Sequence, residues 1–273
     1  MPELDGFLLA AGLGTRMGPL SLALPKPAWT LQGRPLLQWA AEDMRNSGMR
    51  RIACNAHLHP ARLRAAAEGI EVFEEAALLG NAGGLRPALG RTRGPLAVWN
   101  ADAVARVPWA RFRAGYRGLD RELAWLLVPH PGGNWTEVWL DGEGRVLPRG
   151  EAGRGPYLFT GASLWSPSAL AEVPEGPADL APLLPRLEHR GVVVEPFPWR
   201  EIGTPAALIA AAAALAPEAE GRVEGCYVHP GARPAGRLRR CVLGPGAAPP
   251  AAVEDEGAFW FEEEGRQVRL ALP

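Results

Sequence analysis

The first 102 residues alternate short apolar runs with segments in which apolar residues recur every three or four positions. Apolar runs that end at small or acidic residues predict strands over residues 5–10, 51–56, 70–75 and 95–102. Helical spacing predicts helices over residues 36–49, 60–69 and 81–89. This alternation predicts an α/β fold with a mainly parallel sheet, whose ligand sites lie at the carboxyl ends of the strands.

The middle of the chain has a different pattern, in which strands follow one another through tight turns. Strands are predicted over residues 122–130, 136–144, 145–150 and 157–165, with DGEG at 141–144 as a hairpin turn. These strands make the predicted sheet mixed. A helix over 178–191, a strand over 192–198 and a helix over 204–216, begun by Thr204 and Pro205, complete a predicted first domain over residues 1–216.

Residues 217–273 form a predicted second unit. Their apolar residues recur at roughly six-residue steps among glycines and other small residues, which is typical of a β-solenoid. A short C-terminal β extension is therefore expected, and a truncated left-handed β-helix is one form that it could take. An irregular β extension is the alternative.

Composition narrows the class of protein. The formal net charge is −1 and the arginines are dispersed, so neither a nucleic-acid partner nor a membrane partner is expected. The alanine-rich run over 206–216 is too short to span a membrane. Cys54, Cys226 and Cys241 are widely spaced, and the first residues lack a basic signal-peptide segment, so a cytoplasmic protein with reduced thiols is expected.

The loop after the first predicted strand carries the strongest chemical signal. Glycines at 12, 14 and 18 would let a phosphate approach the backbone N–H groups, and Arg16 adds a permanent positive charge. Ten residues later Lys26 stands between Pro25 and Pro27. It is the only lysine among the 29 lysine and arginine residues. Chance would also leave one lysine somewhere, but its place beside this loop favours a phosphate-binding function.

The loop and four later segments resemble the sugar-1-phosphate nucleotidylyltransferases. AAGLGTRMGPLSLALPKP, at 10–27, is similar to their signature AAGxGTRLxPLT…PKP. EEAALLGNAGGL, WNADA, LFTGASLW and WREIGTP resemble their nucleobase, metal, sugar and second metal segments, in the family's order. Mannose-1-phosphate guanylyltransferases and muramate-1-phosphate uridylyltransferases look most similar. The resemblance implies a Rossmann-like nucleotidyltransferase domain.

The resemblance also implies a reaction, in which a sugar 1-phosphate attacks the α-phosphorus of a nucleoside triphosphate and pyrophosphate leaves. Arg16 and Lys26 would be catalytic, and Asp102 and Glu201 would hold Mg²⁺. The nucleotide would bind residues of the loop and of the nucleobase segment: Ala10, Ala11, Gly12, Gly14, Glu75 and Gly80. The sugar phosphate would bind Asn134, Arg149 and Gly161. GTP and mannose 1-phosphate are the first choice of substrates, partly because a carboxylate at Glu75 can accept two hydrogen bonds from guanine.

Departures from the family pattern keep alternatives open. Glu201 stands where the family has Asp, Asn81 where it has Thr, and Ala101 where it has Gly. No basic EKP segment is recognisable, although Arg149 and Arg154 lie in its region. Uridylyl or thymidylyl transfer to another hexose 1-phosphate is one alternative, and a non-catalytic, nucleotide-binding regulatory paralogue is another. A homo-oligomer is also compatible with the sequence.

Overall fold

The structure is a computed structural model that describes residues 4–215 and 223–273. The strands of the first part of the chain are β1 (Gly6–Leu9), β2 (Thr30–Leu31), β3 (Arg34–Pro35), β4 (Ile52–Ala56), β5 (Glu71–Glu74), β6 (Leu96–Asn100), β7 (Ala103–Ala105), β8 (Glu122–Pro129), β9 (Val138–Leu140), β10 (Arg154–Trp165), β11 (Glu188–Val193) and β12 (Trp199–Glu201). Its helices are α1 (Leu20–Ala23), α2 (Leu36–Asn46), α3 (Pro60–Ala66), α4 (Gly80–Gly83), α5 (Trp109–Gly115), α6 (Pro167–Ala171) and α7 (Pro205–Leu215). Short 3₁₀ helices are η1 (Thr15–Met17), η2 (Lys26–Ala28), η3 (Arg86–Ala88) and η4 (Ala181–Arg186).

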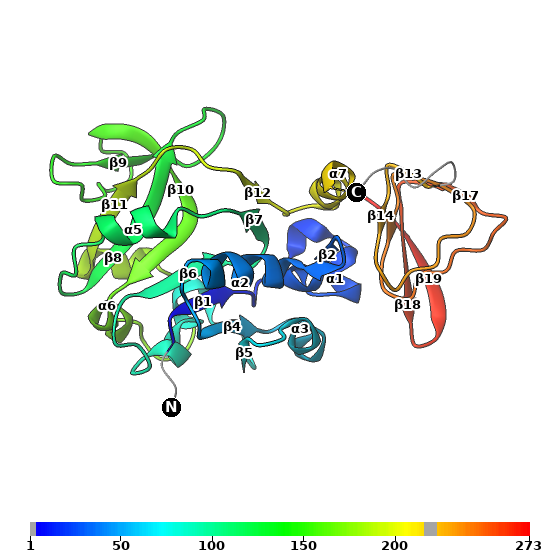
Figure 1. The fold of residues 1–273 in the computed structure, drawn as a ribbon, viewed down its shortest axis with the longest axis horizontal. Helices are drawn as coiled ribbons and strands as arrows, with labels where there is room; N and C mark the ends of the chain where they lie inside the picture. The colour runs from blue at the N-terminus through cyan, green and yellow to red at the C-terminus, as the bar shows by residue number, and fades with distance from the viewer. Residues whose placement is uncertain (1–3, 216–222) are drawn as a thin grey trace.

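A mixed, mainly parallel sheet forms the centre of this part (Figure 1). Its strand order is β11-β8-β10-β6-β1-β4-β5, and β9 pairs with β10 outside this path. β1 is parallel to both β4 and β6, and β4 is parallel to β5, whereas β10 runs antiparallel to β6 and β8. The predicted α/β fold class is therefore confirmed.

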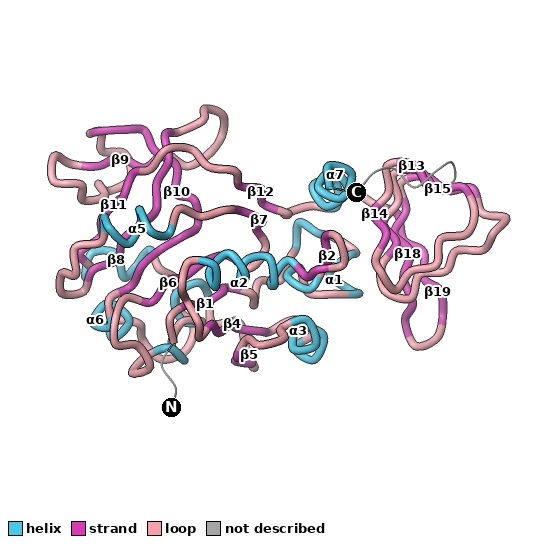
Figure 2. Tube along the Cα trace, viewed as in Figure 1, coloured by secondary structure: helices cyan, strands magenta, loops and turns pink. Residues whose placement is uncertain are grey.

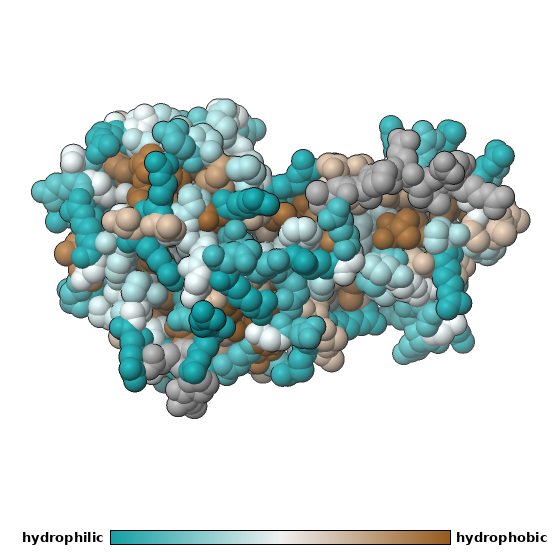
Figure 3. All heavy atoms as spheres, viewed as in Figure 1, coloured by the Kyte–Doolittle hydropathy of each residue, from teal (hydrophilic) through white to brown (hydrophobic). Residues whose placement is uncertain are grey.

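Helices cover both faces of the sheet. Neighbouring residues of a strand point to opposite faces, so β1 contributes to the packing on each side. Leu8 packs in a cluster with residues of α2, α5 and α7, whereas Phe7 packs in a second cluster with residues of α6 and η4. The visible surface in Figure 3 is mostly polar, with separate apolar patches. In the described part of the chain, no helix has the length and apolar character that a membrane span requires.

Two sequence predictions between residues 178 and 198 are wrong. A helix was expected over 178–191, but the chain forms only η4 there, and β11 begins already at Glu188. Pro182 and Pro185 explain the difference, because proline lacks the backbone N–H that a continuing helix needs. The strand expected over 192–198 accordingly ends at Val193. The predicted strand over 145–150 is reduced to two isolated bridges, one between Val146 and Leu140 and one between Arg145 and Arg190.

The C-terminal extension is built from stacked parallel strands (Figure 2). One sheet has the order β13 (Val223–Glu224), β15 (Arg237–Arg239) and β17 (Glu254–Glu256). The other has the order β14 (Tyr227–Val228), β16 (Val242–Leu243), β18 (Ala258–Glu263) and β19 (Arg266–Ala271). Among the described strands of the extension, only β19 is antiparallel to its neighbour. This pairing is that of a short solenoid closed by a hairpin. The predicted boundary between residues 216 and 217 lies outside the described residues.

His189 on β11 gives the fold a predicted pH dependence. The residue is 8% exposed, and burial lowers its pKa from 6.5 to about 3. Below pH 6.5 the unfolded chain therefore takes up a proton that the folded chain does not, and the free energy of unfolding falls as the pH falls towards 3. Between pH 6.5 and pH 5 we expect the free energy of unfolding to fall by about 2 kcal/mol less in His189→Phe than in the wild-type protein, as measured by urea unfolding. His130 is half-buried and provides the comparison, because His130→Gln keeps His189 and should lose more stability between the two pH values than His189→Phe does.

Candidate active site

The candidate site lies where the order of the central strands reverses. From β1 the chain builds β4 and β5 on one side and then returns to place β6 on the other side of β1. Such a reversal leaves a crevice at the carboxyl ends of the two strands. A cavity of about 260 Å³ lies here, lined by Leu9, Ala10, Gly12, Gly14, Thr15, Arg16, Lys26, Pro27, Asp102 and Gly203.

The glycine-rich loop forms one wall of this cavity. Gly14 has φ of +62°, a conformation that favours glycine, and it directly precedes η1, which carries Arg16. The Ser21 hydroxyl donates to the Gly14 carbonyl at 2.9 Å, which ties α1 back to the loop. The loop therefore has a defined shape that presents Gly12, Gly14 and Arg16 to the cavity.

Two cations and two carboxylates meet beside the loop. Lys26 Nζ lies 2.5 Å from Asp102 Oδ2 and 3.8 Å from Glu201 Oε1, and Arg16 forms an ion pair with the same Glu201 oxygen. The Lys26 side chain is 10% exposed, whereas that of Arg16 is 65% exposed. A Cβ atom at Gly203 would lie 3.0 Å from both Arg16 Nη1 and Glu201 Oε1, so the glycine leaves room for this pair.

A small ribbon brings the two carboxylates together. β7 begins one residue after Asp102, and it pairs antiparallel with β12, which ends at Glu201. Glu201 lies opposite Ala103, and the Ile202 N–H donates to the Asp102 carbonyl at 3.0 Å. Residues 99 positions apart in the sequence are thus held side by side by backbone pairing.

Two carboxylates are too few for a metal site made of protein ligands alone, but they suit Mg²⁺. In the described part of the chain, no three His, Cys, Asp or Glu side chains form a group that could hold a metal. Asp102 Oδ1 is buried, and it has no hydrogen-bond partner among residues 4–215 and 223–273. Mg²⁺ commonly takes one or two carboxylates and completes its shell with water and substrate phosphates. Asp102 and Glu201 therefore suit a metal that arrives with a phosphate ligand.

Asn55 is a site residue that the sequence analysis missed. It lies on β4, is 3% exposed, and its Oδ1 accepts from Ala10 N at 2.7 Å and from Ala11 N at 3.3 Å. Its Nδ2 donates to Glu75 Oε1 at 2.7 Å. A polar residue within the buried run IACNA was the available signal, because buried polar groups are normally hydrogen-bonded.

Glu75, which the resemblance assigns to the nucleobase, makes hydrogen bonds within the fold, and its contact with the base stays a prediction. Glu75 is 8% exposed, and its carboxylate accepts from Asn55 Nδ2 and from Leu79 N at 3.0 Å. It does not line the cavity. Glu75 therefore supports Asn55 and, through it, the glycine-rich loop. Gly80 follows at the start of α4, also outside the cavity lining.

The predicted sugar-phosphate residues lie in two other places. Asn134 and Arg149 are both exposed and line a separate hollow of about 530 Å³ with Trp135. The ring centre of Trp135 lies 6.2 Å from that of Trp199, which begins β12. This hollow therefore adjoins the strand that carries Glu201. Gly161 lies beside the end of β6, where an added Cβ would be 2.7 Å from Asn100 Nδ2. Arg154 begins β10 and is exposed.

Replacing Asn55 tests its role in the loop. Asn55→Ala leaves the buried N–H of Ala10 and the Glu75 carboxylate without their partner, so we expect the free energy of unfolding to fall by about 1–3 kcal/mol. The KM for the nucleotide should rise as well, because the loop loses its fixed shape. Urea unfolding and steady-state kinetics measure the two effects. Asn46→Ala, at the exposed end of α2, should change neither.

Comparison with known proteins identifies the family. A model described as a MobA-like NTP transferase domain matches residues 6–223. The chain is 28% identical over 235 residues to an N-acetylmuramate alpha-1-phosphate uridylyltransferase of Caulobacter vibrioides, across 77% of this chain and 96% of that protein. It is 24% identical over 228 residues to a probable mannose-1-phosphate guanylyltransferase of Arabidopsis thaliana, across 74% of this chain and 62% of that protein.

A solved structure has the same fold. The crystal structure of HddC from Yersinia pseudotuberculosis, complexed with GMP-PN, is similar with a TM-score of 0.64 and 21% identity, across 77% of this chain and 98% of that one. The matched region contains the glycine-rich loop, Lys26, Asp102 and Glu201. The chain therefore belongs to the family of MobA-like NTP transferase domains and, within it, to the sugar-1-phosphate nucleotidylyltransferases.

Proposed function

We propose that this chain transfers a nucleotidyl group from a nucleoside triphosphate to a sugar 1-phosphate, with GTP and mannose 1-phosphate as the first choice of substrates and with Mg²⁺ as the metal. The observation that carries the proposal is the contact of Lys26 with Asp102 and Glu201 in the cavity beside the glycine-rich loop. An ammonium, together with two carboxylates that can hold a divalent cation, supplies the positive charge that alignment of two polyanions needs.

In the proposed reaction an oxygen of the sugar phosphate forms a bond to the α-phosphorus, and the bond from that phosphorus to pyrophosphate breaks. The exposed Arg16 binds the β- and γ-phosphates and stays with the leaving pyrophosphate. The buried Lys26 donates to the α-phosphate, where negative charge must be neutralised during transfer. Both cations also contact carboxylates, and each has further N–H groups with which it can donate to a phosphate oxygen.

Asp102 and Glu201 would hold the metal in this proposal. A bound Mg²⁺ supplies positive charge at the phosphates and lowers the cost of charge development in the transition state. The longer side chain of Glu201 still reaches the cluster, because β12 places it beside Asp102. The unpartnered Asp102 Oδ1 supports this assignment.

A second substrate pair has its own support. The matched region spans 96% of the Caulobacter relative, which is a uridylyltransferase acting on N-acetylmuramate 1-phosphate by its name. Glu75 accepts hydrogen bonds from Asn55 and Leu79, which weakens one sequence argument for guanine. UTP with N-acetylmuramate 1-phosphate is therefore the second candidate, and the hollow with Asn134, Trp135 and Arg149 is the proposed sugar side of the site in either case.

Pyrophosphate release tests the proposal. The purified chain is incubated with Mg²⁺ and with GTP, UTP, dTTP, ATP or CTP, each crossed with mannose, glucose, N-acetylglucosamine and N-acetylmuramate 1-phosphates. Release that requires both substrates and peaks with GTP and mannose 1-phosphate supports the first choice. A peak with UTP and N-acetylmuramate 1-phosphate replaces it with the second candidate. Tight nucleotide binding by calorimetry without release from any pair would favour the regulatory paralogue.

A further inference from the structure

We propose that Tyr227 and Phe259 of the C-terminal extension are positioning residues for Lys26, on which they act through Trp29. This inference rests on the proposed role of Lys26 in nucleotidyl transfer. The extension would then contribute to the activity of the site, although none of its described residues lines the cavity.

Lys26 and Trp29 are rigidly connected. Lys26, Pro27 and Ala28 form η2, and Trp29 directly follows it. The Ala28 N–H donates to the Pro25 carbonyl at 2.9 Å, and the Trp29 N–H donates to the Lys26 carbonyl at 3.3 Å. Prolines at 25 and 27 fix the backbone φ on both sides of the lysine. A shift of Trp29 must therefore move the backbone of Lys26.

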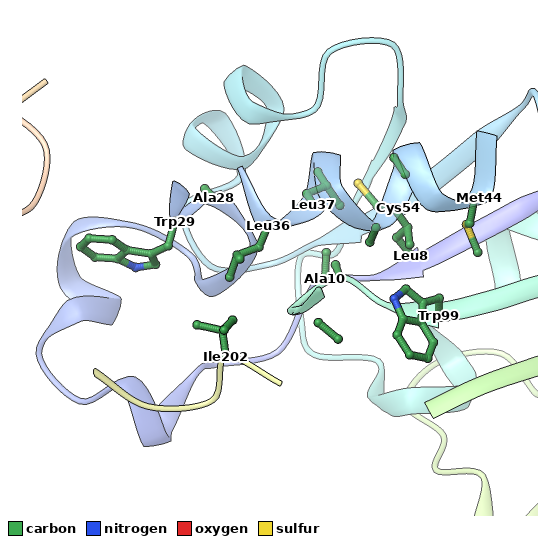
Figure 4. Packing of buried hydrophobic residues seen from close by; sticks show 14 of the residues in the cluster. Leu8, Ala10, Ala28, Trp29, Leu36, Leu37, Met44, Cys54, Trp99 and Ile202 are labelled. Atoms are coloured by element: carbon green, nitrogen blue, oxygen red, sulfur yellow. The ribbon is translucent and has the colours of Figure 1, made fainter. Parts of the chain in front are cut away.

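Trp29 has its aromatic contacts in the extension. It is fully buried, and its ring lies 5.5 Å from that of Tyr227 and 5.9 Å from that of Phe259, in edge-to-face arrangements. Figure 4 shows Trp29 beside Ala28 at the end of the core cluster that lies away from Met44, next to the extension. Phe259 is held in turn by stacking on Phe261 at 4.7 Å. Such aromatic contacts fix both position and orientation.

Tyr227 also fixes the residue after Trp29. Its hydroxyl accepts from the Thr30 N–H at 3.2 Å and shares a hydrogen bond of 2.8 Å with the Thr30 hydroxyl. Tyr227 is 2% exposed, and burial raises its pKa to about 12, so the hydroxyl stays neutral and keeps both bonds at physiological pH. The segment that leaves the lysine is thus held by side chain and backbone together.

The position of the Lys26 backbone matters because its ammonium must reach one place. A positioned group loses effect when it is displaced by much more than about 0.5 Å. Lys26 Nζ is 2.5 Å from Asp102 Oδ2, and four flexible methylenes separate it from the backbone. Restraint of the backbone by the extension therefore limits where the ammonium can lie.

Strand β18 supplies a matched control. Phe259 and Trp260 are neighbours and point to opposite faces of the strand. Phe259 faces Trp29, whereas Trp260 packs with Leu238, Cys241 and Leu243 inside the extension and donates from Nε1 to Asp255 Oδ2. Loss of either ring should weaken the extension, but only loss of the Phe259 ring should disturb Lys26.

The experiment compares Tyr227→Phe, Phe259→Leu and Trp260→Leu in the full chain. For the first two variants we expect kcat to fall about tenfold while the KM for the nucleotide stays within about twofold. Trp260→Leu should keep kcat within about twofold once activity is corrected for the folded fraction. Equal losses of kcat in Phe259→Leu and Trp260→Leu would overturn the proposal, because they would reflect general weakening of the extension.

A second readout does not depend on activity. Lys26 is the only lysine, so the rate of its acetylation by acetic anhydride, followed on the peptide by mass spectrometry, reports one side chain. We expect this rate to rise at least about threefold in Tyr227→Phe and Phe259→Leu, and to stay unchanged in Trp260→Leu. Should the wild-type protein release no pyrophosphate, the proposed function fails, but the acetylation rates still decide whether the extension restrains Lys26. Unchanged rates in all three variants would overturn the inference while leaving the proposed function intact.

Discussion

Lys26→Arg is expected to lower kcat for pyrophosphate release by about a hundredfold or more, with a much smaller change in the KM for the nucleotide. The Lys26 side chain is 10% exposed, and its ammonium contacts Asp102 at 2.5 Å within a cavity of about 260 Å³. A planar guanidinium is larger and spreads its charge over a rigid fork, so it cannot take the place of a compact ammonium in that space. Kinetics at saturating concentrations of both substrates measure the effect.

The opposite exchange provides the control for Lys26→Arg. Arg237 lies on β15 with a side chain that is 79% exposed, and Arg237→Lys should leave kcat unchanged. If Lys26→Arg kept activity within threefold of the wild-type value, the reaction would not require a lysine at this position. In that case the assignment of Lys26 to the α-phosphate would have to be abandoned.

Asp102→Asn is expected to reduce pyrophosphate release by about a thousandfold and to weaken its dependence on Mg²⁺. The amide keeps the shape of the side chain, and the backbone bond from Ile202 to the Asp102 carbonyl is unaffected. The substitution removes the negative charge that faces Lys26 and that a divalent cation requires. Titration of Mn²⁺ by electron paramagnetic resonance, with a non-hydrolysable nucleotide present, measures metal binding without turnover.

An exposed aspartate separates this effect from a general loss of charge. Asp120 has a side chain that is 77% exposed, and Asp120→Asn should keep both activity and Mn²⁺ affinity. If Asp102→Asn bound Mn²⁺ as tightly as the wild-type protein did, Asp102 would serve Lys26 alone. The metal would then have to be held by other groups.

The central part of the fold and the cluster of charges were predictable because their signals are local. Each parallel strand is an apolar run that ends at small or polar residues, and loops at adjacent strand ends meet at one edge of a sheet. This reasoning singled out Arg16 and Lys26, the resemblance of WNADA added Asp102, and the structure places all three in one cavity. Glu201 was identified from its motif. The pairing of β12 with β7 explains why it lies beside Asp102.

Longer-range contacts could not be predicted in the same way. Asn55 acts through hydrogen bonds to residues 44, 45 and 20 positions away, and no period in the sequence marks such partners. The same holds for Tyr227, which contacts Thr30 across 197 residues. Glu75 was placed against a base because a carboxylate in a binding segment looks available for a ligand. In the packed structure its carboxylate is buried and accepts from Asn55 and Leu79, contacts that the sequence does not mark.

The hairpin of β18 and β19 has a consequence for self-association. Stacked parallel strands leave unpaired backbone groups at their last strand, and a second chain can add to such an edge and start a fibre. Here β19 is the last strand of its sheet, and it carries the exposed Arg266 and Arg269, of which Arg269 is paired with Asp255. Charged side chains along an edge strand oppose the addition of a second strand there. This edge of the sheet that ends in β19 is therefore protected against polymerisation by strand addition.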